Sequence, residues 1–126
     1  DAHAMLTSAA VLRPGDVAVG ISHSGSTSDT VGALAEARRK GASTIAITNF
    51  PRSPISEVSD HILTTAARET TFRSGATASR LAQLTVIDCV FVGLAQLRYA
   101  DTREALEATY EAVRGLRISR EERRRS

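Results

Sequence analysis

The apolar residues of the chain fall into short β-branched runs that alternate with longer segments of helical spacing. Val17–Ile21, Thr44–Thr48 and His61–Thr65 have the length and composition of strands, and the first is apolar on both faces, as in a parallel strand buried on both sides. Apolar residues three or four positions apart predict helices over Ala2–Leu12, Ser28–Lys40, Ile55–Val58, Gly75–Arg98 and Asp101–Gly115. This alternation predicts an α/β domain built on a parallel sheet.

Capping and stop residues mark the ends of the predicted helices. Thr27 or the residue after it is expected to cap the second helix, and Gly41 is expected to stop it. Asp101 and Gly115 are expected to play the same two roles for the last helix. Residues 116–126 would then form a frayed, basic C-terminal tail.

The predicted helix Gly75–Arg98 is apolar around most of its circumference. Such a helix is buried on several sides, which here indicates a subunit interface in addition to contact with a sheet. A homo-oligomer, either a dimer or a tetramer, is therefore expected. The longest unbroken apolar run in this half, Cys89–Ala95, is too short to span a bilayer, so no contact with a membrane is predicted.

A turn rich in hydroxyl groups connects the first predicted strand to the helix that follows. This serine turn consists of Ser22, His23, Ser24, Gly25, Ser26 and Thr27. At such a junction the unpaired helix amides and the helix dipole favour an anion, while glycine lets a ligand approach the backbone. Phosphate binding is one interpretation, and simple capping of the helix is the other. The turn matches neither a Walker A loop nor a dinucleotide-binding glycine pattern, so a nucleotide is not the first expectation.

A second polar segment, Ala66–Ser74, follows the third predicted strand. Ligands of parallel α/β sheets bind beyond the carboxyl ends of the strands, where both this segment and the serine turn are expected. Their convergence at one edge favours a ligand site over capping alone.

Composition and charge limit the functions open to the chain. Of the 126 residues 42% are apolar and only 4% aromatic, so the core must be aliphatic and a base-stacking surface is not expected. The last eleven residues carry five arginines against two glutamates, a local charge of +3, which leaves −1 for residues 1–115. The folded part therefore has no basic excess with which to bind nucleic acid.

Cysteine and histidine usage indicates a cytoplasmic protein without a metal site. Cys89 is the single cysteine and has apolar neighbours, so it is expected to be a core residue. A lone cysteine without a signal peptide is typical of the cytoplasm. His3, His23 and His61 show no metal-ligand spacing, and no cofactor is expected.

Three motifs, Gly20–Thr27, Asn49–Pro54 and Ala67–Glu69, resemble the sugar isomerase (SIS) domain. The serine turn is common to SIS domains, whereas the other two motifs are most similar to the version at the C-terminal end of RpiR/MurR-type transcriptional regulators. The resemblance runs from Asp1 to about Leu97. It implies a SIS domain over residues 1–115, with a three-layer α/β/α fold and a parallel sheet in flavodoxin-like order.

The resemblance implies a phosphosugar ligand bound at the serine turn. Ser22, Ser24 and Thr27 match phosphate-binding positions, and His23 is a further candidate contact beside Gly25 and Ser26. Glu69 and Ser74 match a glutamate and a serine that line the sugar side.

Three roles are open to Glu69. In SIS isomerases the matching glutamate can act as the base that moves a proton between sugar carbons. Beside Arg68 and Arg73, it could equally accept hydrogen bonds from sugar hydroxyls or be a solvated surface charge. The acceptor role is favoured here.

The resemblance also implies that part of the domain precedes this chain. A SIS domain begins with a strand, a helix and a strand before the point at which this chain starts, and the regulators add an N-terminal helix-turn-helix module. Three of five strands would then be present, with Val17–Ile21 as an unpaired edge that invites pairing with another chain. DNA would be contacted only through the helix-turn-helix module outside this chain.

Three functions are compatible with these observations. The first is an effector-sensing and dimerisation domain that binds a sugar phosphate and shifts a transcriptional regulator between DNA-binding states. The second is an aldose–ketose phosphosugar isomerase with Glu69 as base, which would lack a convincing second acid or base. The third is a structural dimerisation module whose pocket has lost its ligand.

Overall fold

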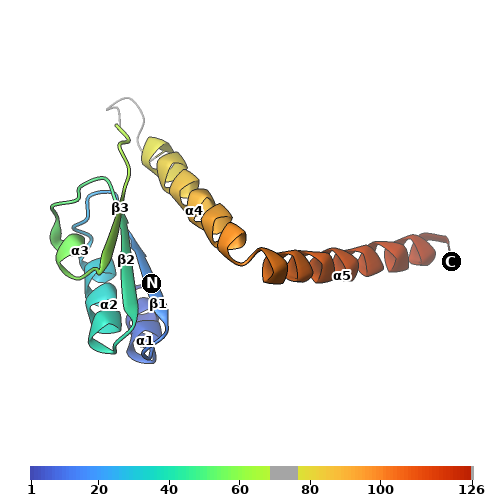
Figure 1. Ribbon diagram of the computed structural model, residues 1–126, viewed down its shortest axis with the longest axis horizontal. Coiled ribbons are helices and arrows are strands. Elements are labelled where there is room, and N and C mark those ends of the chain that lie inside the picture. Colours follow the sequence, from blue (N-terminus) through green and yellow to red (C-terminus); the bar gives the residue numbers. More distant parts are fainter. Residues whose placement is uncertain (69–76, 126) are drawn as a thin grey trace. The chain divides into compact units, whose positions relative to one another are not determined.

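The computed structural model describes residues 1–68 and 77–125, with side chains as far as residue 114. Its elements follow in the order α1 (Ala2–Ala10), β1 (Val17–Ile21), α2 (Ser28–Arg39), β2 (Ser43–Thr48), α3 (Pro54–Glu57), β3 (His61–Thr64), α4 (Thr77–Leu97) and α5 (Tyr99–Arg125) (Figure 1). The chain divides into two compact units, Asp1–Asp88 and Cys89–Ser126.

The three strands form a parallel sheet in the order β1-β2-β3 (Figure 1). Ile21 at the end of β1 lies opposite Ile47, and Thr48 at the end of β2 lies opposite Thr64. All three strands therefore end at the same edge of the sheet. The predicted parallel α/β arrangement is confirmed, and the serine turn leaves this carboxyl edge.

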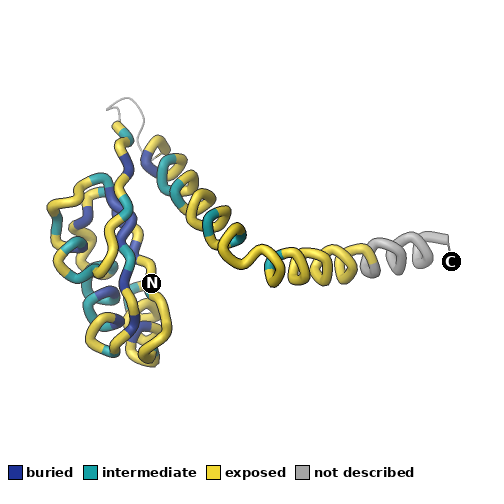
Figure 2. The backbone as a smooth tube through the Cα atoms, viewed as in Figure 1, coloured by how far each residue is buried: buried dark blue, intermediate teal, exposed yellow. Residues whose placement is uncertain are grey.

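Small side chains let the helices pack closely on one face of the sheet. Leu34 of α2, Ala46 of β2 and Ile55 of α3 form one buried cluster. A Cβ atom at Gly20 would lie 3.0 Å from Leu34 Cδ2, so a larger residue there would displace α2. A second cluster joins α1 to α2. Figure 2 shows the buried residues concentrated in this part of the chain. The aliphatic core expected from the sequence is present, and it is rich in alanine.

The edge strand β1 differs from the prediction that it is buried on both faces. Gly20 faces α2, and the alternate residues Val17, Val19 and Ile21 are 55%, 54% and 40% exposed. β1 pairs with β2 alone among the described strands, so the predicted unpaired edge is confirmed. A second helical layer over the other face of the sheet stays a prediction.

α4 forms where the sequence predicts it, and many of its apolar side chains are exposed. Those at least a third exposed are Leu81, Leu84, Ile87, Val90, Phe91, Val92, Leu94 and Leu97. Cys89 is exposed as well, which corrects its expected place in a core. With 21 residues and a mean hydropathy of 1.4, α4 is long and apolar enough to cross a membrane by length and composition alone. Core helices of soluble proteins pass the same test.

α5 is longer than predicted at both ends. It begins at Tyr99, and Asp101 does not cap it, because the Asp101 carboxylate instead accepts hydrogen bonds from the Arg98 guanidinium at 2.8 and 3.2 Å. The helix also continues through Gly115 to Arg125, which corrects the predicted stop at Gly115. The basic C-terminal tail over residues 116–126 stays a prediction as a separate region of the chain. A glycine inside a helix costs only about 1 kcal/mol, which the helix-forming arginines and glutamates around it offset.

Candidate functional site

The hydroxyl groups of the serine turn form an inner and an outer pair. The buried Ser22 Oγ accepts a hydrogen bond from the Gly25 amide at 3.1 Å and lies 2.9 Å from Thr27 Oγ1. Ser24 Oγ accepts hydrogen bonds from the Ser26 amide at 3.2 Å and from Ser26 Oγ at 2.9 Å. The inner pair closes the turn, whereas the outer pair is exposed and available to a ligand.

The start of α2 is consistent with an anion site. Thr27 is the N-cap residue, but its side chain makes no capping bond to the helix in the described structure. The first intrahelical bond runs from the Val31 amide to the Thr27 carbonyl at 3.0 Å. The first-turn amides before Val31 therefore have no intrahelical acceptor and can donate to an anion. The missing side-chain bond weighs against capping by the Thr27 hydroxyl, and phosphate binding at the turn stays a prediction.

The chain that follows β2 braces the serine turn from one side. Thr48 Oγ1 and the Asn49 amide both donate to the His23 carbonyl, at 3.2 and 3.1 Å. The Ile55 amide donates to the Gly25 carbonyl at 2.9 Å. The turn is thus held in shape by long-range bonds as well as by its own hydroxyls.

His23 is half-buried and has an unusual environment. Its ring lies edge-on to Phe50, with centroids 5.7 Å apart and an interplanar angle of 80°. Its Nδ1 atom is buried and has no hydrogen-bond partner within the described part of the chain. Buried polar atoms are rarely unpaired, so a polar ligand at the turn would supply a partner that the protein does not.

The chain that follows β3 is tied to the same edge of the sheet. Asn49 Oδ1 accepts hydrogen bonds from Thr65 Oγ1 at 3.2 Å and from the Ala67 amide at 2.7 Å. The structure therefore brings the six residues of the serine turn together with the start of the predicted Ala66–Ser74 segment. Glu69 and Ser74 themselves lie outside the described residues.

Sequence reasoning assigned no role to Thr48, Asn49, Ser53 or Thr65. The available signal was their position, because Thr48, Asn49 and Thr65 end or follow a strand at the carboxyl edge where ligands of parallel sheets bind, and Ser53 precedes α3 in the loop after β2. Which of their atoms meet depends on the packing of three loops, which no local pattern encodes.

The described residues suit phosphate better than a metal ion. Among residues 1–68 and 77–125 no group of three or more His, Cys, Asp or Glu side chains could hold a metal. The serine turn contains neither Lys nor Arg, so its donors are hydroxyl and amide groups. Such neutral donors can bind a phosphate by hydrogen bonds at a helix N-terminus.

A separate groove of about 610 Å³ runs along β1 between α1 and α2. Met5, Val19 and Leu34 contribute to its walls, which are mostly apolar. An apolar groove beside a strand edge suits another polypeptide segment better than a sugar phosphate. It is not part of the serine-turn site.

Known proteins share both the sequence and the fold of this chain. The SIS domain family model matches residues 1–93. An uncharacterized HTH-type transcriptional regulator of Caldanaerobacter subterraneus is 47% identical over 113 residues, which are 90% of this chain and 40% of that protein. The HTH-type transcriptional regulator RpiR of Escherichia coli is 38% identical over 109 residues, 86% of this chain and 37% of that protein.

The structure is also similar to that of the Vibrio vulnificus NanR protein complexed with ManNAc-6P. The TM-score is 0.81 at 29% identity, over 92% of this chain and 44% of the NanR chain. The chain thus spans about two fifths of the length of the curated relatives it matches. Since the family model covers most of its residues and the parallel sheet and serine turn agree with it, this chain belongs to the SIS domain family.

Proposed function

We propose that this chain is the phosphosugar-binding, effector-sensing and dimerisation domain of an RpiR-type transcriptional regulator. The observation that carries the proposal is the serine turn, which is fixed by long-range hydrogen bonds and presents hydroxyl and amide donors at the start of α2. A relative of the same fold, NanR, was solved in complex with the phosphosugar ManNAc-6P.

The phosphate of the ligand is assigned to the serine turn. Ser24 and Ser26 are exposed and bonded to each other, so their hydroxyls can turn toward phosphate oxygens with little loss of structure. The hydrogen bond between Ser22 and Thr27 closes the inner side of the turn, and Gly25 lets the ligand approach the backbone closely. The unpaired Nδ1 atom of His23 is a further group to which the ligand can bind. Glu69 and Ser74 are proposed for the sugar side, with Glu69 accepting hydrogen bonds from sugar hydroxyls.

A sensor is favoured over an isomerase. The relatives of this chain are transcriptional regulators, although the SIS domain also occurs in isomerases. In the sensor, the ligand shifts the equilibrium between two states of the regulator, and no bond of the sugar is changed. DNA contact is assigned to a helix-turn-helix module outside residues 1–115, in a cytoplasmic regulator.

The exposed apolar residues of α4 support an oligomer. Eight large apolar side chains on one 21-residue helix form more apolar surface than a monomer usually leaves in water. We assign this surface to contact with a second copy of the chain.

Thermal shift and calorimetry test the ligand. The full chain is titrated with ManNAc-6P and a panel of hexose and pentose phosphates, with the free sugars and inorganic phosphate as controls. A sugar phosphate that binds only the folded protein raises the melting temperature, whereas its free sugar does not. Analysis of the sugar by NMR after incubation should show no isomerised product. An equal shift with the free sugar would contradict the phosphate site, and turnover would favour the isomerase.

Two variants test the assignment of the turn. Ser24→Ala and Thr27→Ala should each weaken sugar phosphate binding by on the order of 1 kcal/mol or more, the first because it removes a hydrogen bond to a charged group and the second because it removes the bond to Ser22 that closes the turn. Ser43→Ala is the matched control, because Ser43 is exposed at the opposite end of β2. Unchanged affinity in both turn variants would refute the site.

A further inference from the structure

Asn49 links two segments that do not contact each other through the sheet. Its backbone amide donates to the His23 carbonyl in the serine turn at 3.1 Å. Its side-chain Oδ1 accepts from the Ala67 amide at 2.7 Å and from Thr65 Oγ1 at 3.2 Å, both in the chain that leaves β3. One residue therefore binds the backbone of both segments at the carboxyl edge of the sheet.

The position of Asn49 in the sheet gives this link its importance. β2 lies between β1 and β3, so the serine turn and the chain after β3 share no strand ladder. The last hydrogen bond between β1 and β2 runs from the Ser22 amide to the Ile47 carbonyl at 3.1 Å. The last one between β2 and β3 runs from the Thr65 amide to the Thr48 carbonyl at 2.9 Å. Beyond these bonds residues 65–68 have no regular secondary structure, so Asn49 Oδ1 sets where their backbone runs.

A phosphosugar ligand needs contacts from both segments at the same time. The serine turn can satisfy the phosphate, but the sugar ring extends beyond the phosphate and must be recognised by another part of the edge. If the distance between the two segments is fixed before the ligand arrives, less conformational freedom is lost when both ends of the ligand are bound.

We propose that Asn49 is a positioning residue that fixes the serine turn and residues 65–68 in one geometry, and so determines selectivity for a phosphosugar over phosphate alone. This inference rests on the proposed phosphosugar function. Asn49 acts through the backbone of His23 and Ala67, and direct contact with the ligand is not required of it.

The test separates positioning from a simple contribution to stability. Asn49→Ala removes the acceptor and keeps the backbone amide that bonds His23. Thr65→Val removes one donor to Asn49 and keeps the Ala67 bond, while Thr65→Ser retains the hydroxyl as the matched control. Affinities of the full chain for ManNAc-6P, or for the sugar phosphate with the largest thermal shift, and for inorganic phosphate are measured by calorimetry together with the melting temperature.

Asn49→Ala should weaken sugar phosphate binding about tenfold, as expected for the loss of hydrogen bonds that orient one half of the site. Inorganic phosphate affinity should change by less than about twofold, because the serine turn keeps its own bonds and the His23–Asn49 backbone bond. Thr65→Val should show a smaller loss in the same direction, and Thr65→Ser none. The double variant Asn49→Ala/Thr65→Val should be no weaker than Asn49→Ala alone, because Thr65 is proposed to act through Asn49.

The outcomes distinguish this inference from the function on which it rests. Equal loss of both affinities in Asn49→Ala, or loss of neither, would overturn the positioning role while leaving the phosphosugar site intact. Wild-type protein that binds no sugar phosphate more tightly than inorganic phosphate would overturn the proposed function, and the inference with it. If Asn49→Ala does not fold, Thr65→Val decides, and unchanged selectivity in that variant overturns the role.

Discussion

Gly25 is the residue on which the shape of the serine turn depends most directly. Its φ of +67° lies in the left-handed region that favours glycine. A Cβ atom there would collide with Ser53 Oγ and would lie 2.6 Å from Ser53 Cβ. Both the backbone conformation and the space therefore exclude a side chain.

Replacement of Gly25 should destabilise the protein and disrupt the site. We expect Gly25→Ala to lower the free energy of unfolding by about 2–4 kcal/mol, from left-handed strain and overpacking together. Urea denaturation measures the change. The double variant Gly25→Ala/Ser53→Gly should recover the overpacking part, because it removes the atoms that collide. Gly32→Ala is the control, since a Cβ at Gly32 meets nothing within 4 Å and alanine favours a helix. Equal destabilisation by both alanines would refute this account.

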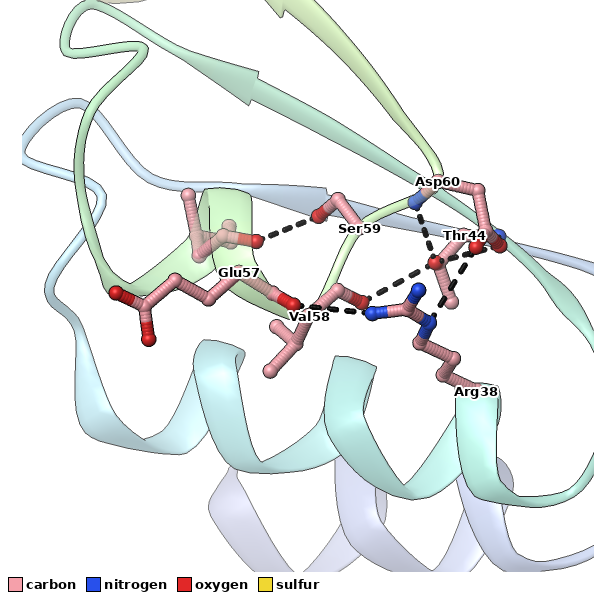
Figure 3. Close-up of polar contacts among 7 residues, drawn as sticks. Arg38, Thr44, Glu57, Val58, Ser59 and Asp60 are labelled. Carbon is pink, nitrogen blue, oxygen red and sulfur yellow. Dashed lines mark hydrogen bonds and ion pairs between the residues drawn. The ribbon is translucent and has the colours of Figure 1, made fainter.

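A second polar cluster lies at the opposite edge of the sheet, around Thr44 and Asp60 (Figure 3). Asp60 Oδ2 accepts from the Thr44 amide and hydroxyl, each at 2.9 Å, and Arg38 Nε lies 3.3 Å from Asp60 Oδ1. Arg38 also donates to the Glu57 carbonyl at 3.0 Å. The Thr44 hydrogen bonds, aided by the Arg38 charge, lower the pKa of Asp60 below its usual value of 3.8. The cluster joins α2 to the starts of β2 and β3.

This cluster predicts how stability depends on acid pH. Because the folded-state pKa of Asp60 is lowered, its contribution is complete above pH 3.8 and is lost as the pH falls through the lower folded value. Asp60→Asn should melt below wild type at neutral pH, and the difference should shrink as the pH is lowered toward that value. Melting curves from neutral to acid pH measure it. Glu57→Gln, whose carboxylate points away from the cluster in Figure 3, should not change the pH dependence. A constant difference at every pH would contradict the role of the ionised carboxylate.

At the scale of elements, the exposed edge of β1 is expected to promote self-association. Val19 is 54% exposed on a strand that has a partner on one side only among the described strands. Val19→Lys should reduce the species larger than a dimer in sedimentation velocity over a concentration series, because a charged edge resists strand pairing. Stability should stay within about 0.5 kcal/mol, as for an exposed position. Val11→Lys changes an exposed valine outside the sheet and is the control. If it reduces association as much as Val19→Lys, the edge is not responsible.

The elements themselves could be predicted because each is encoded locally. β1 matches its predicted range, and the serine turn could be placed because a β-branched run and a helical pattern flank it. The parallel order followed from their alternation. The same local rules were wrong at Asp101 and Gly115, where a salt bridge and strong helix formers compete with the capping and stop signals.

The connections between loops could not be predicted, because they depend on the tertiary fold. In the sequence, Asn49 is one polar residue in a proline-containing loop, and nothing in that pattern indicates its partners. In the structure it forms hydrogen bonds with His23 and Ala67, which are 26 and 18 residues away. The contact that restricts Gly25 likewise comes from Ser53 in another loop. The burial of β1 was overestimated because an apolar composition on both faces does not say whether a helix covers each of them, and the face that carries Val17, Val19 and Ile21 is exposed.

At the scale of the whole molecule, the apolar surface of α4 has to be covered, by a bilayer or by protein. The helix carries Arg80 and Asp88, and Asp88 stands near its middle. An ionised residue at the centre of a bilayer costs roughly 2.5–3.5 kcal/mol, which disfavours insertion. At the surface of a protein dimer the same residues can stay hydrated at the rim while the apolar ones are buried.

A charged substitution on α4 decides between these environments. We expect wild-type protein to sediment as a dimer or tetramer and Phe91→Arg to weaken association at least about tenfold, since exposed aromatic residues are frequent anchors of interfaces. The fold of the monomer should persist, because Phe91 is 59% exposed within the chain. Leu6→Arg changes a 44% exposed residue on α1 and should leave association unchanged. Flotation with phosphatidylcholine vesicles tests the bilayer, and wild-type protein should stay with the soluble fraction. A wild-type protein that is monomeric, or that floats with the vesicles, would contradict the assignment of the α4 surface to contact with a second copy. The phosphosugar site at the serine turn would not be affected by that result, because the ligand titrations test it independently.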